Sequence, residues 1–284
     1  MQDNSNKIHI IKASGEQEVF NVNKLKYSLL NAGADALVVD FIVDDIKQWI
    51  KPGYTTKQIY RRAFELLNKN KNKSSIRYKL KQAIMELGPT GYPFEKFVGK
   101  LLEKQGFKTE VGVIVEGSCV NHEIDVIATC EQSQYLIECK YSSDQGKNVK
   151  VQVPLYVRSR VNDIIKKRKN NPNYQNLNFE GWVVTNTRFS ADAMQYGKCS
   201  GLHLIAWDYP QGNGLKEMIE KVKIYPITIL DSLTKNQKQQ LILQGIVICY
   251  QLVENPEIMA TLNLSHRKQN DLQRELKHIS NNQH

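Results

Sequence analysis

A chain of 284 residues, 41% of them hydrophobic, is long enough for two domains and a smaller third segment. No stretch approaches the roughly 18 apolar residues of a membrane span, and the start lacks the apolar segment of a signal peptide, so we expect a cytoplasmic protein. The net charge of +10 favours a polyanionic partner, and residues 1–88 hold most of the excess, with 15 Lys and Arg against 9 Asp and Glu.

The first residues predict a β-hairpin followed by helices. Two strand-like runs, at 8–12 and 17–22, flank Ser14-Gly15, where glycine suits the turn. Helices are then expected from a cap at Asn23 to Gly33 with Leu25, Leu29 and Leu30 on one face, at about 37–50, from Thr55 or Thr56 onward, and at about 75–87. The Gly- and Pro-rich segment at 88–93 closes this domain, which we assign to residues 1–88.

From residue 89 onward, helical and strand-like patterns alternate. Strands are expected at 107–115, 123–129, 134–140, 180–185 and 202–207, and helices at 94–105, about 150–169 and 190–200. This order predicts an α/β domain at 89–210, with helices on both sides of a mixed sheet. The remaining residues, 211–284, predict a helical C-terminal region, helical throughout 232–279 apart from a break at Asn255-Pro256.

Three charged residues on two apolar strands carry the chemistry. Asp125 lies in HEIDVIA, and Glu138 and Lys140 lie in YLIECKY, where strand alternation puts both side chains on the same face. Buried charges are costly without partners, and a hard divalent cation such as Mg²⁺ or Mn²⁺ suits two carboxylates while keeping waters for a phosphate. An ammonium beside it can activate a water, which indicates phosphodiester hydrolysis.

A simpler interpretation is that Glu138 and Lys140 only form an ion pair on a strand edge and that Asp125 is a turn residue. The apolar strands, the hairpin spacing and the flanking helices favour the catalytic interpretation over this one. His122 and Glu123 next to Asp125 are interpreted as exposed loop residues or as supporting groups.

Residues 89–210 resemble the Mrr-like branch of the PD-(D/E)XK nucleases, which have an αβββαβ core. The resemblance lies in GPTGYPFEKFVGKLLEKQGF, NHEIDVIA, LIECKY and VVTNTRFSADAMQYGKCSGLHLIAWD, although Ile124 replaces the proline of the family name. It implies that Asp125 and Glu138 bind the metal ion, that Lys140 is the catalytic lysine and that Glu95 supports the metal shell. It also implies a role for a glutamine after the lysine strand, here Gln152.

Residues 8–88 resemble an ATP-cone, a nucleotide-sensing domain, through IIKASGEQEVFNVNKLKYSLLNAG and GYTTKQIYRRAFELL. The resemblance implies that ATP or dATP binds as a regulatory ligand. The positions that fall where the family contacts its nucleotide are Lys12, Glu18, Asn21, Lys24, Thr56 and Tyr60. A domain kept only for packing or partner contact is the alternative, since the family's hairpin arginine is replaced by Ala13.

A basic run of Arg158, Arg160, Lys166, Lys167, Arg168 and Lys169, interrupted by Asp163, lies in the helix predicted at about 150–169. Its last four residues are the candidate contacts to nucleic acid. Such a run either tracks the phosphates of a nucleic acid or is a solvated helix face, and the sequence leaves both open.

Taken together, the sequence predicts a metal-dependent endodeoxyribonuclease of the restriction or defence type, regulated by ATP or dATP and assembled as a homo-oligomer. The alternatives are a catalytically silent protein that binds nucleic acid and responds to nucleotides, and a nuclease for RNA or branched repair intermediates. Phosphate contacts alone do not distinguish these substrates.

Overall fold

The computed structural model describes residues 8–12, 14–32, 34, 36–69, 74–144 and 146–280. The chain divides into two compact units, the first formed by residues 1–82 with 144–146 and the second by 83–143 with 147–284. Each unit has its own core. In the described part of the chain, none of the helices combines enough length and apolar character to cross a membrane.

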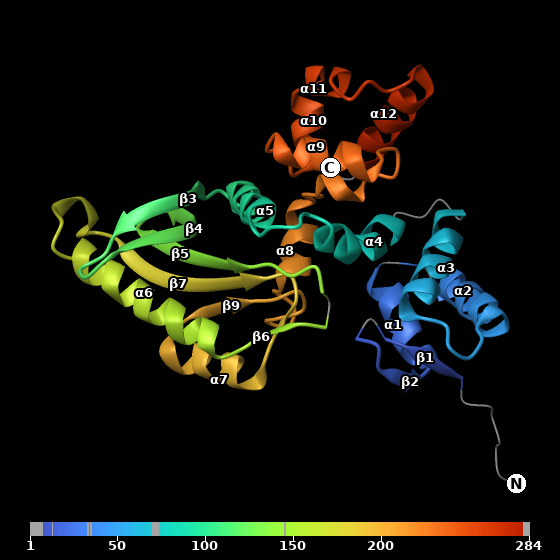
Figure 1. Cartoon of the computed structure of the whole chain (residues 1–284), viewed down its shortest axis with the longest axis horizontal. Helices are drawn as coiled ribbons and strands as arrows, with labels where there is room; N and C mark the ends of the chain where they lie inside the picture. Colours follow the sequence, from blue (N-terminus) through green and yellow to red (C-terminus); the bar gives the residue numbers. More distant parts are fainter. Residues whose placement is uncertain are drawn as a thin grey trace, which may run out of the picture. The chain divides into compact units, whose positions relative to one another are not determined.

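The first unit is a β-hairpin with helices packed behind it (Figure 1). Strands β1 (His9–Ile11) and β2 (Gln17–Val19) pair antiparallel, and Gly15 takes a positive φ of 82° in the turn. The helices are α1 (Val22–Asn31), α2 (Ala36–Trp49), α3 (Thr56–Lys69) and α4 (Ser74–Met85), which crosses the boundary between the units. Their core includes Leu29, Ile42, Ile46, Ala63 and Leu67.

The start of α1 differs from the prediction. Asn21 caps this helix, because its side chain accepts hydrogen bonds from the backbone N–H groups of Asn23 and Lys24. Asn23 is already inside the helix, and Leu30, predicted to share a face with Leu25 and Leu29, is 49% exposed while those two are buried. Thr55 caps α3 as predicted, since its hydroxyl accepts from Gln58 N at 3.2 Å.

The second unit contains a mixed five-stranded sheet with the strand order β3-β4-β5-β7-β9. Its strands are β3 (Lys108–Glu116), β4 (Asn121–Cys130), β5 (Ser133–Lys140), β7 (Asn178–Thr185) and β9 (His203–Ile205). The first three pair antiparallel as a meander, and β7 and β9 add parallel strands. This confirms the predicted mixed sheet.

Helices cover both faces of the sheet (Figure 1). α5 (Tyr92–Glu103) packs on the antiparallel strands, and α6 (Gln152–Arg168) and α7 (Ala191–Ser200) pack on the other face. Short elements complete the domain: β6 (Asn148–Val149), η1 (Pro172–Tyr174) and β8 (Arg188–Phe189). Ile127, Leu136, Val157, Val161 and Ile164 belong to the apolar core that joins α6 to the sheet.

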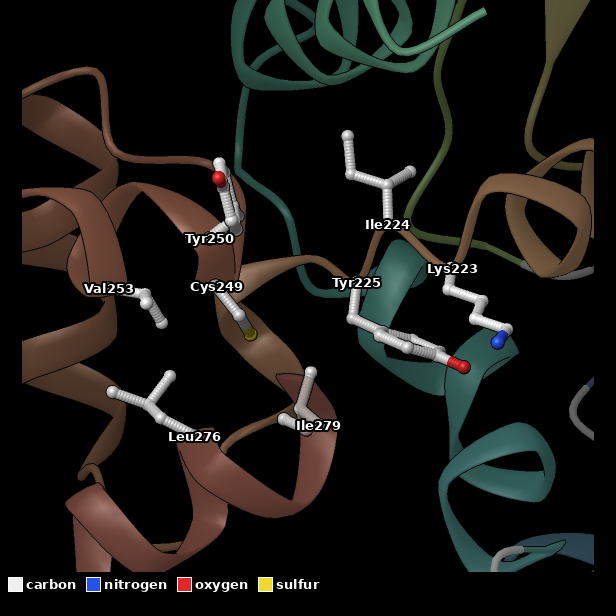
Figure 2. A pocket seen from close by; sticks show the side chains of 8 residues that line it. All are labelled: Lys223, Ile224, Tyr225, Cys249, Tyr250, Val253, Leu276 and Ile279. Carbon is white, nitrogen blue, oxygen red and sulfur yellow. The ribbon is translucent and has the colours of Figure 1, made fainter. Parts of the chain in front are cut away.

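The C-terminal region is divided into short helices, whereas the sequence predicted a helical run with one break. They are α8 (Leu215–Val222), η2 (Ile227–Ile229), α9 (Lys235–Leu243), α10 (Cys249–Glu254), α11 (Glu257–Ala260) and α12 (His266–Ser280). The space between Tyr225, Cys249, Leu276 and Ile279 is about 10 Å³ (Figure 2), which admits one water molecule at most. This space is therefore a packing defect and not a ligand site.

Candidate active site

The backbone pairing of β4 with β5 ends at the predicted catalytic residues. Val126 and Ile137 are the last residues that pair at this end of the ladder. The next two positions, Asp125 and Glu138, have no backbone pairing with each other. The Asp125 side chain takes over, because its Oδ2 accepts a 2.7 Å hydrogen bond from Cys139 N. β5 itself continues to Lys140 along β7. The strands thus diverge where the two carboxylates lie.

Glu138 lies between two cationic side chains. The residue is 5% exposed, and its Oε1 is 2.5 Å from Lys140 Nζ while its Oε2 accepts a hydrogen bond from Arg160 Nη1. Arg160 comes from α6 and also donates to the carbonyl oxygen of Glu123 at 3.0 Å. Its guanidinium carbon is 4.3 Å from the centre of the Tyr156 ring. Both oxygens of this buried carboxylate therefore have charged partners.

Arg160 was predicted only as part of the basic run and not as a partner of Glu138, although the sequence holds a signal for this contact. Its position is three residues after Val157 and four before Ile164, and both of these side chains are buried on the sheet side of α6. Residues at these spacings share one helix face. An arginine on the apolar face of a helix beside a charged strand indicates a buried ion pair.

Glu95 and Asp125 both hold their protons more strongly than ordinary carboxyl groups. The Glu95 pKa is raised to about 7, by burial and then by the negative charges of Asp125, Glu123 and Glu138. The Asp125 pKa is raised to about 6, by burial and by the charge of Glu138, and the Cys139 N–H offsets part of this rise. The acidic groups are therefore close enough to repel one another in a partly buried site.

This charge pattern fits a divalent cation. Burial and mutual repulsion disfavour the ionised carboxylates, and a cation between them would remove that penalty. Within the described residues, no group of three or more His, Cys, Asp or Glu side chains is arranged to hold a metal ion. The pair Asp125 and Glu138 fits Mg²⁺, which keeps several waters and takes one or two protein carboxylates.

The other predicted nuclease residues differ in burial. Glu95 is half-buried in the first turn of α5, and its role in the metal shell stays a prediction. Gln152 is the exposed first residue of α6. His122 and Glu123 lie in β4 and not in a loop, and His122 Nε2 is 2.8 Å from Asp163 Oδ2 on α6.

The structure separates the members of the basic run. Lys166 and Lys169 are exposed, and Lys167 is 2.7 Å from Glu116. Arg168 is only 7% exposed and donates to the Gln134 side chain, with its guanidinium over the Tyr174 ring. Burial also lowers its pKa. The prediction that Arg168 contacts DNA conflicts with this burial, because the helix turns its side chain toward the sheet.

In the first unit, three of the predicted nucleotide residues form a charged cluster. Glu18 Oε2 is 3.0 Å from Lys24 Nζ and 3.5 Å from Lys12 Nζ. The side chain of Asn21 is used as the helix cap. Thr56 is the first residue of α3, and Tyr60 is half-buried against the core. The cationic groups expected to meet phosphates thus lie together at the hairpin.

Two known protein families match parts of the second unit. A family described as "Restriction endonuclease" matches residues 88–218, and a family described as "AF1548-like, C-terminal" matches residues 225–280. Neither match includes the residues before 88. An uncharacterized protein of Archaeoglobus fulgidus is 34% identical over 187 residues, which cover 64% of this chain and 99% of that protein.

Solved structures agree with this assignment. The crystal structure of AF1548, a protein of unknown function, has a TM-score of 0.55 and 32% identity, covering 68% of this chain and all of that chain (100%). The MspJI restriction endonuclease in complex with a 27-mer oligonucleotide has a TM-score of 0.34 and 15% identity over 51% of this chain and 31% of its own, which supports no conclusion. The chain therefore belongs to the AF1548-like family, with a restriction endonuclease domain at 88–218 followed by an AF1548-like C-terminal domain at 225–280.

Proposed function

We propose that this protein is a divalent-metal-dependent endonuclease that hydrolyses phosphodiester bonds in DNA and acts in restriction or defence. The observation that carries the proposal is the arrangement at the diverging ends of β4 and β5. There, Asp125 and Glu138 lie beside Lys140 within a restriction endonuclease domain. A structural ion pair alone explains Glu138 and Lys140, but it leaves the acidic groups of Glu95 and Asp125 without a reason to be gathered there.

Asp125 and Glu138 would hold Mg²⁺ or Mn²⁺, which when bound stabilises the negative charge that builds on the phosphate. Lys140, kept next to Glu138, orients the attacking water and lowers its pKa. The water gives up a proton to solvent as its oxygen bonds to phosphorus, the bond from phosphorus to the sugar oxygen breaks, and the leaving oxygen takes up a proton from solvent. Cys139 N–H fixes the Asp125 carboxylate through a hydrogen bond to its Oδ2.

The test is a cleavage assay on supercoiled plasmid, linear duplex, single-stranded DNA and RNA, each with Mg²⁺, Mn²⁺ or EDTA. We expect metal-dependent cleavage of DNA that Asp125→Asn abolishes and that Glu131→Gln, a neutralised carboxylate on an exposed turn, leaves intact. Cleavage of RNA alone would transfer the proposal to a ribonuclease. Binding of DNA without cleavage under any metal condition would favour a catalytically silent protein.

We also propose that the first unit binds ATP or dATP and that the nucleotide changes the activity of the nuclease. The support is the cluster at Glu18, which brings Lys12 and Lys24 together beside the hairpin turn. Lysine ammonium groups are suitable partners for phosphates. A nucleotide changes activity only if it binds one state of the protein more tightly than another.

A further inference from the structure

We propose that Arg160 takes the place of the divalent cation at Glu138, competes with it, and transfers to a phosphate of the DNA when the cation binds. The inference rests on the proposed function and assigns a positioning residue to the same site. Arg160 then has two opposing effects, because it weakens metal binding to the free protein and strengthens the binding of DNA.

The first step concerns the oxygens of Glu138. Oε1 is held by Lys140 and Oε2 by Arg160, and the carboxylate is almost fully buried. A cation can reach Glu138 only if one of these partners leaves. Lys140 acts on the attacking water in the proposed mechanism and has to stay beside Glu138, so Arg160 is the partner that makes way. Arg160 reaches in from α6 on a long side chain, which can move away by rotation.

The second step concerns the donors of Arg160. Its Nη1 donates to both Glu138 and the Glu123 carbonyl. Its Nε is buried and has no hydrogen-bond partner within the described residues. A buried donor without an acceptor is costly, so the arrangement around this guanidinium is incomplete. An additional anion beside Arg160 would complete it.

The third step concerns the identity of that anion. A guanidinium presents paired donors that match the oxygens of a phosphate, and that of Arg160 lies over the Tyr156 ring. The scissile phosphate must come close to Glu138 if this residue binds the catalytic metal. Arg160 is therefore within reach of the substrate as soon as it releases Glu138. The exchange keeps each charge paired before and after binding.

The test compares Arg160→Gln with the wild type in two binding measurements. Calorimetry with Mn²⁺ in the absence of DNA should show several-fold tighter metal binding by the variant, since its competing cation is gone. Fluorescence anisotropy with a duplex oligonucleotide in Ca²⁺ should show several-fold weaker DNA binding. Arg160→Lys should lie between the two proteins in both measurements, because it keeps the charge and loses the paired donors.

Arg274→Gln is the control, since it removes the same charge from an exposed position on α12, where Arg274 pairs with Asp271, and we expect both affinities to stay within about twofold of the wild type. A purely structural role for Arg160 would weaken metal and DNA binding together, and that result, or no change in either, overturns the proposal. If Arg160→Gln does not fold, Arg160→Lys provides the test, and we expect tighter Mn²⁺ binding and weaker DNA binding than in the wild type. If the wild-type protein cleaves DNA and Arg160→Gln binds Mn²⁺ and DNA as tightly as the wild type, this inference alone is refuted. Wild-type protein that neither binds Mn²⁺ nor cleaves refutes the proposed function and this inference with it.

Discussion

The carboxylate of Asp125 accepts the backbone N–H of Cys139 at 2.7 Å, in the place where a carbonyl of β4 would serve if the two strands kept pairing. One oxygen of the Asp125 side chain thereby replaces a backbone acceptor of the sheet. The orientation of the carboxylate follows from the backbone of β5 and not from a flexible loop.

This placement predicts the effect of single substitutions on catalysis. Asp125→Ala and Lys140→Ala should each reduce cleavage by about 10³-fold or more, since both act on one attacking water, and the double variant should be scarcely worse than either. Single-turnover cleavage of a linear duplex measures these rates, with circular dichroism to verify the fold. Full activity in Asp125→Ala would remove this residue from the site.

A second prediction concerns the stability contributed by Glu138. Glu138→Ala leaves Arg160 buried without its carboxylate, and breaking such a pair costs about 3 kcal/mol of unfolding free energy. Combining it with Arg160→Met should recover much of that loss. Urea unfolding in EDTA measures both. Glu116→Ala, which breaks the exposed pair with Lys167, serves as the control and should cost less than about 1 kcal/mol. Equal losses in the two alanine variants would contradict the buried pair.

The basic run yields a third prediction, revised by the burial of Arg168. Neutralising Lys166, Lys167 and Lys169 should weaken DNA binding and reduce the slope of log affinity against log salt by about 2 to 3, if all three meet phosphates. Arg168→Gln should instead lower the unfolding free energy and leave the salt slope as it was. Anisotropy titrations at several salt concentrations distinguish the two. An unchanged slope in the triple variant returns these lysines to a solvated helix face.

The pH dependence of stability gives a fourth prediction. The Glu95 pKa rises from 4.5 to about 7 on folding, so the folded protein binds this proton more tightly than the unfolded chain. The stability due to protonated Glu95 is complete below pH 4.5 and is lost as the pH rises through 7. Glu95→Gln should therefore raise the unfolding free energy at pH 8 in EDTA, by about 1 to 2 kcal/mol after solvent screening, and leave it unchanged at pH 4.

Urea unfolding at pH 4, 6 and 8 tests this pH dependence, with the exposed Glu131→Gln as the control. Saturating Mg²⁺ should remove the advantage of Glu95→Gln, because the cation relieves the same repulsion. A variant less stable than the wild type at pH 8 would show that Glu95 is held by attraction and not by repulsion.

The nucleotide proposal gives a fifth prediction. ATP or dATP should bind to the whole protein in calorimetry, and Lys12→Ala and Lys24→Ala should weaken the binding about tenfold each through the loss of a phosphate contact. Lys26→Ala is the control, because this lysine pairs with Asp40 and not with Glu18. Light scattering and cleavage assays with each nucleotide then show whether assembly and activity change. Absence of binding at millimolar nucleotide would end the regulatory proposal.

Much of the architecture follows from local patterns in the sequence. The alternation in β3, β4 and β5 and the apolar faces of α5 and α6 indicated each element to within a few residues. The same alternation placed Glu138 and Lys140 on one face, as their 2.5 Å contact bears out. Chemistry on consecutive strands is local enough to be predicted.

The features that the sequence did not predict depend on contacts between distant residues. In the sequence, Arg168 cannot be distinguished from the lysines beside it. Its burial depends on its contact with Gln134, which lies 34 residues away along the chain. Arg160 likewise gains its role from Glu138 across 22 residues. The cap at Asn21 was missed for a different reason, since Asn23 offered the same side chain two positions later. The residue types alone do not show which of the two asparagines caps the helix.

Helix α6 meets the sheet through polar side chains at three places along its length. Arg160 contacts Glu138, Asp163 accepts from Cys119 N at 3.0 Å and from His122, and Arg168 contacts Gln134. A rotation or a shift of the helix by one residue would break all of these contacts at once, so together they fix the position of α6 on the sheet. Gly117 belongs to the same alignment, because a Cβ there would lie 2.2 Å from Asp163 Oδ2 and 2.5 Å from the Val120 carbonyl oxygen, so the Asp163 side chain or the turn would have to shift. A side chain at position 117 would therefore disturb one of the contacts that align α6, and with it Arg160, on the sheet.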